Sequence, residues 1–198
     1  MVDLLTGIFS AFGLSASAGL NAYIPLLVIA LVARYSNLIR LNSPWNMITN
    51  GWVIGVLVFL SLIEFFADKV PAINHLNDAV QTFVRPVAGA IVFAASAKVI
   101  TDVHPVLSLI AGLLVAGGVH AVKSLAVRPA VTATTGGAAN VPVSVAEDIL
   151  ATFLSILSAL VPVLIAVLLI LLAVGVIWWL WRRDRRRENR DFYRQASS

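Results

Sequence analysis

The chain has 198 residues, of which 60% are hydrophobic and only 12% charged, and its mean hydropathy is +0.93. A soluble domain contains about 45 to 50% apolar residues, so the composition predicts an integral membrane protein with no room for a soluble domain. The expected fold class is all-α, a transmembrane helical bundle of about five spans with broken or re-entrant helices. The absence of cysteine excludes disulfides, thiolate metal sites and cysteine nucleophiles.

The net charge of +4 lies in the last residues of the chain. Residues 182–198 contain seven arginines and three acids, whereas residues 1–181 contain seven bases and seven acids. We therefore expect residues 1–181 to form the transmembrane domain and residues 182–198 to form an arginine-rich cytoplasmic tail. Contact with anionic lipid explains such a tail without nucleic-acid binding.

The first apolar segment, residues 4–34, is interrupted by the polar sequence SASAGLNAY at residues 15–23. A helix of about 31 residues would measure about 46 Å and exceed a hydrocarbon core of about 30 Å, which favours a broken span or a re-entrant hairpin. Irregular backbone at this depth must be buried in protein or face a watery cavity. The candidate cavity residues are Ser15, Ser17, Asn21 and Tyr23.

The second apolar segment runs from Trp52 to Ala67 and contains Glu64, with Asp68 one helical turn later. Paired carboxylates near a membrane core can bind protons or cations. An interfacial salt bridge between this pair and Lys69 is the alternative.

Residues 71–85 predict an amphipathic helix. Its apolar side chains alternate at helical spacing with a polar face that includes Asp78, Gln81 and Arg85. Two placements are open: the helix lies in the membrane interface, or it packs across the mouth of the bundle.

After Pro86 we expect a short apolar helix that contains Lys98, a break at residues 101–105, and a span over residues 106–127. Glycine and alanine in this span permit close helix contact, and a homo-oligomer is compatible with them. His120, Lys123 and Arg128 mark the end of the span. His120 could relay protons or serve as a hydrogen-bonded structural residue.

Residues 129–143 predict one long loop, rich in threonine, glycine and alanine. Its backbone amides and hydroxyls suggest an anion cradle, with a flexible connection as the alternative. A bound cation, or pairing of Glu147 and Asp148 with Lys123 or Arg128, is equally compatible with the pattern. The cradle residues are Thr134, Thr135, Gly136, Gly137 and Asn140. A capping box at Ser144 and Glu147 would begin the last helix, which extends to Trp181 and which Pro162 should kink or divide.

Tryptophans beside the arginine-rich tail place the C-terminus inside the cell. With five crossings the N-terminus would then lie outside and the loop at residues 34–50 inside. Aligning Pro25 with Pro105 matches two interrupted apolar segments, with breaks at Asn21 and Thr101. This pattern suggests an inverted repeat with units 4–85 and 86–160, although apolar segments with prolines also resemble one another by chance.

Three segments in order, SASAGLNAYIPLL, FADKVPAINHLNDAVQTFVRPVAGA and TATTGGAANVPVSVAED, resemble the small bacterial multi-pass membrane proteins classified as domain of unknown function 4126. The similarity covers roughly residues 5 to 160. It implies a multi-pass protein of the bacterial inner membrane and brings no established activity and no site residues.

No catalytic motif, metal-ligand spacing or cofactor motif is present, so we expect no enzyme and no cofactor. The sequence favours a transporter, channel or flippase-like protein, in which the broken stretches at Asn21 and Asn140 meet in a wet polar cavity. The substrate would be a small polar or ionic solute or a lipid headgroup. The alternative is a scaffold that recruits partners through its tail and its amphipathic helix.

Overall fold

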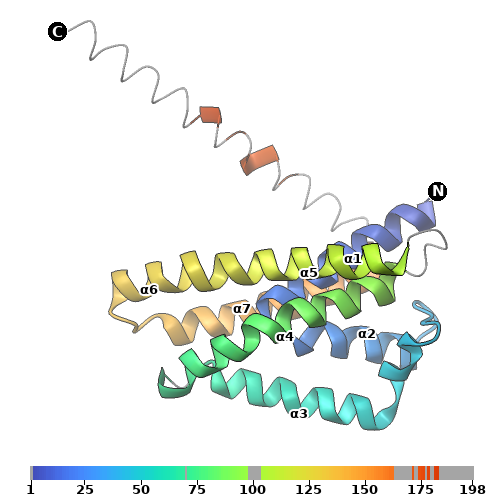
Figure 1. The fold of residues 1–198 in the computed structure, drawn as a ribbon, viewed down its shortest axis with the longest axis horizontal. Helices are drawn as coiled ribbons and strands as arrows, with labels where there is room; N and C mark the ends of the chain where they lie inside the picture. Colours follow the sequence, from blue (N-terminus) through green and yellow to red (C-terminus); the bar gives the residue numbers. More distant parts are fainter. Residues whose placement is uncertain are drawn as a thin grey trace, which may run out of the picture.

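The computed structural model describes residues 2–69, 71–97, 104–162, 171, 174–176, 178, 181 and 182. These residues form a helical bundle in which the structure describes no strand, which confirms the all-α fold class (Figure 1). The elements in chain order are α1 (Val2–Leu20), α2 (Tyr23–Tyr35), the 3-10 helix η1 (Trp45–Thr49), α3 (Gly51–Ala67), α4 (Pro71–Ala97), α5 (Pro105–Val122), the π-helical turn η2 (Lys123–Val127), α6 (Arg128–Thr135) and α7 (Asn140–Leu160).

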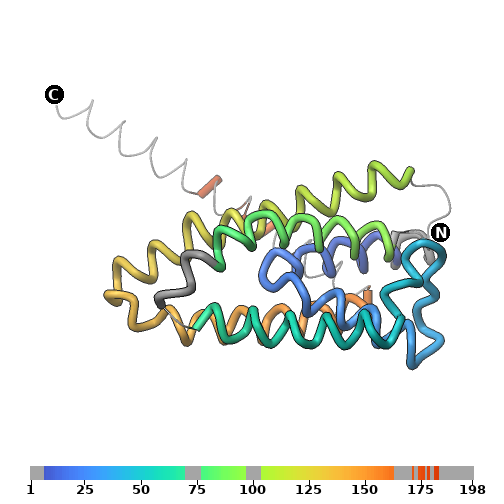
Figure 2. The backbone as a smooth tube through the Cα atoms, turned by 60° about the horizontal axis from the view of Figure 1, so that its bottom comes forward, coloured from blue at the N-terminus to red at the C-terminus, as the bar shows by residue number. Residues whose placement is uncertain are grey.

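The first apolar segment is a re-entrant hairpin. Helix α1 enters the bundle from one end, the chain turns at Asn21 and Ala22, and α2 returns to the same end (Figure 2). The N-terminus and the loop at residues 36–50 therefore lie at one end of the bundle. Of the two arrangements that the sequence left open, a broken span and a re-entrant hairpin, the structure has the hairpin; the placement of these two segments on opposite sides of the membrane required a crossing.

Four helical runs extend lengthwise beside this hairpin: α3, α4, the continuous run α5–η2–α6, and α7 (Figure 1). Within the described residues, three segments are long and apolar enough to cross a membrane, namely Asn77–Ser96, Pro105–Thr135 and Asn140–Leu160. Shorter apolar helices cover Gly7–Leu20, Tyr23–Tyr35 and Gly51–Ala67. These helices indicate a membrane protein. The predicted division near Pro162 is confirmed, because α7 ends at Leu160.

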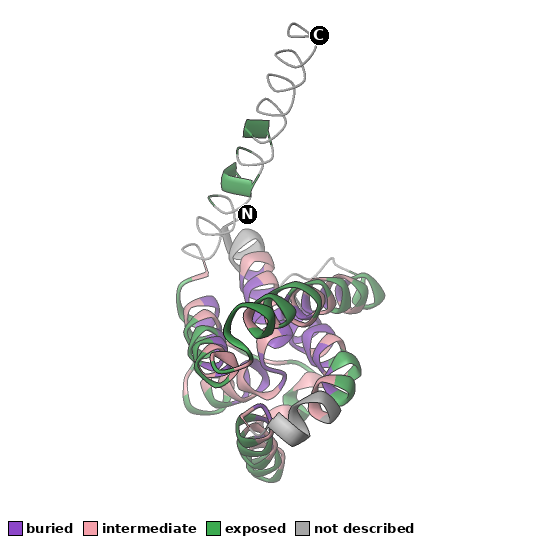
Figure 3. Cartoon of the chain, turned by 90° about the vertical axis from the view of Figure 1, so that its left-hand side faces the viewer, coloured by how far each residue is buried: buried purple, intermediate pink, exposed green. Residues whose placement is uncertain are grey.

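Helix α4 is amphipathic with its polar face directed inward. Gln81 and Arg85 are buried, whereas Val80 and Phe83 are exposed on the outer surface. The helix also continues through Pro86 to Ala97 instead of ending there. The predicted interfacial placement is therefore wrong, since this polar face pairs with charges inside the bundle. Figure 3 colours the residues by burial and shows the buried ones on the inner faces of the helices and the exposed ones on the outer faces.

Small residues allow α1, α4 and α5 to approach closely. A Cβ added at Gly112 would overlap the carbonyl oxygen of Gly89, and one added at Gly89 would overlap the side chain of Ala116. Contacts of this kind bring helix backbones together where lipid supplies no hydrophobic driving force. They place α1 in the centre of the bundle, packed against α4, α5 and α7.

The predicted long loop at residues 129–143 is instead a short turn between two helices. Helix α6 ends at Thr135, Gly136 and Gly137 adopt positive φ angles of 60° and 89°, and α7 begins at Asn140. The predicted capping box is also wrong, because Ser144 lies a full turn inside α7. The glycines of this stretch form the C-terminal cap of α6 and the turn that follows it. The loop was predicted because threonine and glycine are also the residues typical of loops.

The boundary proposed between repeat units 4–85 and 86–160 falls inside α4. Thr101, the second proposed break, lies outside the described residues; α4 ends at Ala97 and α5 begins at Pro105. The repeat itself stays a prediction.

Candidate functional site: a buried charge cluster at the helix break

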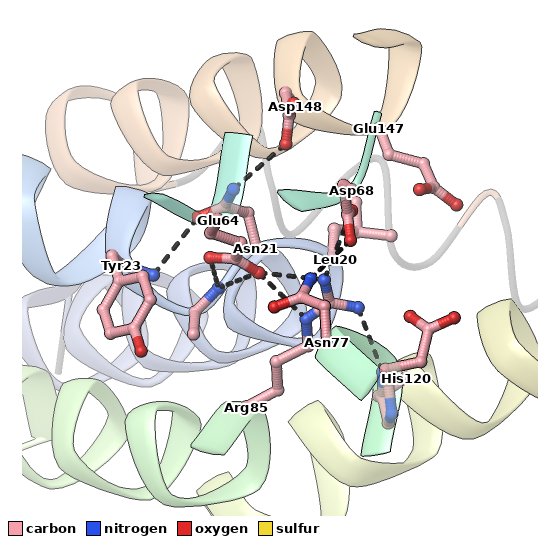
Figure 4. Close-up of polar contacts among 12 residues, drawn as sticks. Leu20, Asn21, Tyr23, Glu64, Asp68, Asn77, Arg85, His120, Glu147 and Asp148 are labelled. Carbon is pink, nitrogen blue, oxygen red and sulfur yellow. Dashed lines mark hydrogen bonds and ion pairs between the residues drawn. The ribbon is translucent and has the colours of Figure 1, made fainter. Parts of the chain in front are cut away.

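The tip of the re-entrant hairpin exposes backbone amides at the start of α2, and side chains of the protein satisfy them (Figure 4). The Oδ1 of Asn21 accepts hydrogen bonds from the amides of Tyr23 (3.2 Å) and Ile24 (3.1 Å). The amide of Ala22 donates to the carboxylate of Glu64, at 3.1 Å from Oε2. Three amides that a helix start leaves unpaired are thus bonded, and a carboxylate lies at the positive end of the helix dipole.

The last carbonyl of α1 has the complementary partner. The Nζ of Lys123 donates to the carbonyl oxygen of Leu20 at 3.1 Å, which puts a positive charge at the negative end of α1. The sequence predicted a wet polar chamber as the compensation for this break. That prediction is wrong for Asn21, because protein side chains bond the tip on both of its sides.

Glu64 itself is held by a buried ion pair with α4. Both Nε and Nη2 of Arg85 bond Glu64 Oε1, at 3.2 and 2.9 Å, and both side chains are at most 1% exposed. The Nη1 of Arg85 lies 3.1 Å from the Nδ1 of His120, which must accept because arginine only donates. His120 is then neutral, with its proton on Nε2 directed at the hydroxyl of Thr82 (3.2 Å).

Asp68, which follows the end of α3, connects three bases. Its Oδ2 lies 3.0 Å from Nη2 of Arg128, 3.5 Å from Nζ of Lys123 and 3.7 Å from Nη2 of Arg85. The side-chain amide of Asn77 donates a hydrogen bond to Oδ1 of Asp68 at 2.7 Å. Three cationic side chains and one side-chain amide thus surround the Asp68 carboxylate.

Helix α7 supplies two further acids. Glu147 forms an ion pair with Lys123 at 2.8 Å, and Asp148 forms one with Lys69 at 2.9 Å. Asp148 also accepts a hydrogen bond from the side-chain amide of Asn21 at 3.0 Å. We call the connected set the charge cluster. Its ionisable members are Glu64, Asp68, Lys69, Asp78, Arg85, His120, Lys123, Arg128, Glu147 and Asp148. Five acids and four cationic bases give these residues a formal charge of −1 with every acid ionised and His120 neutral.

Several predicted site residues meet in this cluster: Asn21, Glu64, Asp68, His120, Lys123 and Arg128. Ser15 and Ser17 lie apart from its charges. The hydroxyl of Ser15 donates to Gly112 on α5 at 2.8 Å, and that of Ser17 donates to Ala151 on α7 at 2.7 Å. Both serines thus join α1 to its neighbours. Tyr23 lines an apolar groove of about 360 Å³ between α2 and α4.

The predicted anion cradle lies at the exposed end of the bundle, away from the charges. The hydroxyls of Thr134 and Thr135 donate to carbonyls one turn back in α6, and Asn140 exchanges hydrogen bonds with Thr132. The turn therefore bonds within itself. Ser144 lies one turn further along, in α7. Its hydroxyl contacts the charge cluster, because it donates a hydrogen bond to Oδ2 of Asp68 at 3.3 Å. Lys98 lies outside the described residues.

Sequence reasoning did not bring Asn77, Asp78 or Arg85 to the site. Asp78 and Arg85 were assigned to the polar face of an amphipathic helix at the membrane interface or across the mouth of the bundle. Pairing of Glu147 and Asp148 with Lys123 or Arg128 was one of the alternatives left open, and Glu147 pairs with both bases. A signal was present, since residues 1–181 contain equal numbers of acids and bases in a very apolar chain. Balanced charge in such a chain indicates internal pairing, but it does not identify the partners.

A groove of about 610 Å³ leads from the outer surface to this cluster. It lies between the α5–η2 run and α7, and apolar residues form most of its lining, including Val122 and Leu150. Lys123 and Glu147 complete the lining at its inner side. The groove thus ends beside the buried Lys123–Glu147 pair.

The family model for a domain of unknown function (DUF4126) matches residues 8–183. The chain belongs to this family. The matched range contains the helices that supply the charge cluster and both walls of the groove. No curated protein and no solved structure matches the chain.

Proposed function

We propose that the chain is a membrane transporter that moves a small charged group, either a free solute or the headgroup of a lipid, through the charge cluster. One observation carries the proposal. The two half-helix ends at the hairpin tip are closed by Lys123 and Glu64, which are charged side chains of a larger ion-pair network. Broken membrane helices with ends directed at charges are where transporters bind their substrates.

The chemistry of the cluster supports exchange of partners. The Nζ of Lys123 lies 3.1 Å from the carbonyl oxygen of Leu20, 2.8 Å from Glu147 and 3.5 Å from Asp68. An entering anion or cation can therefore replace one partner while the others hold. Replacing an ion pair by another ion pair avoids leaving a buried charge unpaired, which costs several kcal/mol. Release of the tip from Lys123 would let α1 and α2 shift, which couples substrate entry to movement of the hairpin.

Orientation is part of this proposal. The arginines of residues 182–198 favour a cytoplasmic C-terminus in the inner membrane of a bacterium, with anionic lipid beside the tail. Trp178 and Arg182 agree with an interfacial position, since the Arg182 guanidinium lies 4.9 Å from the indole ring centre. The scaffold alternative is weaker, because the polar face of α4 that would recruit partners is buried at Gln81 and Arg85.

The test is flux in proteoliposomes that contain the purified protein, with a panel of small ions, polar solutes and labelled phospholipids. We expect transport of at least one class above empty vesicles, and its loss in the Glu64→Gln/Arg85→Gln double variant. Arg34→Gln is the matched control, because Arg34 belongs to no ion pair of the charge cluster and donates to the loop carbonyl of Thr49. Absence of transport for every class would contradict the proposal.

Deletion of residues 182–198 separates transporter from scaffold. A transporter should retain flux when the shortened protein still inserts, since no member of the charge cluster lies in the tail. A scaffold should lose its partners instead. Loss of flux with correct insertion would move the function to the tail.

A further inference from the structure

The groove between α5–η2 and α7 has a chemistry of its own. Its volume is about 610 Å³, within the range of sites that hold small ligands. Val122 and Leu150 on its rim are 61% and 47% exposed and belong to the apolar outer surface. Its inner side carries Lys123 and Glu147, which form an ion pair at 2.8 Å and are almost fully buried. The groove surface is thus almost entirely apolar, and the Lys123–Glu147 pair lies largely covered at its inner side.

A missing side chain creates part of this space. Gly118 lines the groove, and a Cβ added there would meet no atom within 4 Å. By contrast, Gly112, less than two turns earlier, is packed against α4 without room for a methyl group. The glycines of α5 therefore serve two purposes: Gly112 permits helix contact, and Gly118 leaves an open volume.

We propose that this groove binds one phospholipid with an amine-bearing, zwitterionic headgroup, whose acyl chain lies along the apolar walls. The headgroup complements the inner side by exchange of partners: its ammonium takes Glu147, and its phosphate takes Lys123. Each charge of the Lys123–Glu147 pair stays paired after the exchange.

A second copy of this chain is a poorer occupant. The outer surface of the described helices consists of large apolar side chains such as Trp52, Phe59 and Leu62. Such side chains could fill the mouth of the groove but bring no charge to its inner side. A zwitterionic lipid supplies both the apolar chain and the two charges.

Binding of the lipid in the groove does not depend on the proposed function. Only the transport of the bound lipid rests on the proposed function. Binding is therefore measured directly. The full-length protein is reconstituted in vesicles that contain a phosphatidylethanolamine analogue with a photoreactive group on its acyl chain. Crosslinked peptides are then mapped, with unlabelled phosphatidylethanolamine or phosphatidylglycerol as competitor.

Gly118→Trp should fill the groove and reduce crosslinking to α5 and α7 at least fivefold. Gly55→Trp is the matched control, since a Cβ at Gly55 also meets no atom within 4 Å and this glycine lies on exposed α3, outside the groove. Val122→Trp is a second blocking variant at an exposed position, which keeps the test valid if Gly118→Trp does not fold. Phosphatidylethanolamine should compete better than phosphatidylglycerol.

Crosslinks spread evenly over the apolar surface would overturn the inference, and so would equal competition by the two lipids. It would also be overturned by equal crosslinking in the Gly118→Trp and Gly55→Trp variants, or by crosslinking that Val122→Trp leaves unchanged. A loss of self-association in Gly118→Trp without any lipid crosslink would assign the groove to a second copy instead. Transport of a free solute with no lipid binding would leave the proposed function standing while the lipid assignment fails. Lipid binding without any transport would give the opposite outcome.

Discussion

Lys123 on the π-helical turn η2 donates a hydrogen bond to the carbonyl oxygen of Leu20, 103 residues away, where α1 ends inside the bundle. A helix that ends within hydrocarbon leaves carbonyls that water cannot satisfy. The π-helical turn, a form that recurs at functional sites, carries the lysine that bonds this carbonyl. The re-entrant hairpin and the charge cluster are therefore parts of one structure.

Removal of the Lys123 charge should destabilise the protein. Lys123→Met leaves the carbonyl of Leu20 without this donor and leaves Glu147 with the more distant Arg128, at 3.5 Å, and breaking a buried ion pair costs about 3–5 kcal/mol. The measurement is thermal or denaturant unfolding of the purified protein in mild detergent. Lys69→Met, at a more exposed pair with Asp148, should cost clearly less. Equal losses in the two variants would show that the tip does not depend on Lys123.

The Glu64–Arg85 pair allows structure and function to be separated. Glu64→Gln alone leaves a buried guanidinium without its main partner and should cost about 3–5 kcal/mol of stability. The double variant Glu64→Gln/Arg85→Gln removes both charges and should recover most of that loss, because glutamines can hydrogen-bond each other without a net charge. A double-mutant cycle measures the coupling. Additive losses, with no recovery, would contradict a direct interaction between these two side chains.

Close helix packing predicts different tolerance for two glycines of α5. Gly112→Ala forces a methyl group against the backbone of Gly89 and should cost about 1–3 kcal/mol through overpacking. Gly117→Ala places its methyl group 3.6 Å from Pro86, an ordinary contact, and should be neutral or stabilise by up to about 1 kcal/mol through helix propensity. Unfolding midpoints of the two variants decide the matter. Similar midpoints would mean that α4 and α5 do not approach at Gly112.

Local patterns in the sequence predicted the helices well. The apolar composition gives an all-helical membrane bundle, and the polar interruption at residues 15–23 locates the one break that lies inside it among the described residues. Pro162 likewise marks the end of α7. These features depend on residues within a few positions of each other, which is why a single sequence reveals them.

Features that depend on distant partners were predicted less well. The polar face of α4 was assigned to the membrane interface, because nothing near Arg85 in the sequence identifies Glu64 on α3 as its partner. The turn at Gly136 and Gly137 was assigned to a loop that approaches Asn21, but Asn140 begins a helix two turns before Asp148, which is the residue that contacts Asn21. Amphipathicity alone does not state whether a polar face meets water or buried charge.

The most direct test of the account is the sidedness of the first segment. The chain contains no cysteine, so single cysteines at Val2, Asn37 and Thr134 can be labelled with a membrane-impermeant maleimide in sealed, oriented vesicles. The re-entrant hairpin predicts that residues 2 and 37 react from one side of the membrane and residue 134 from the other. Labelling of residues 2 and 37 from opposite sides would show that the first segment crosses the membrane, and the hairpin with its charge-bonded tip would be contradicted.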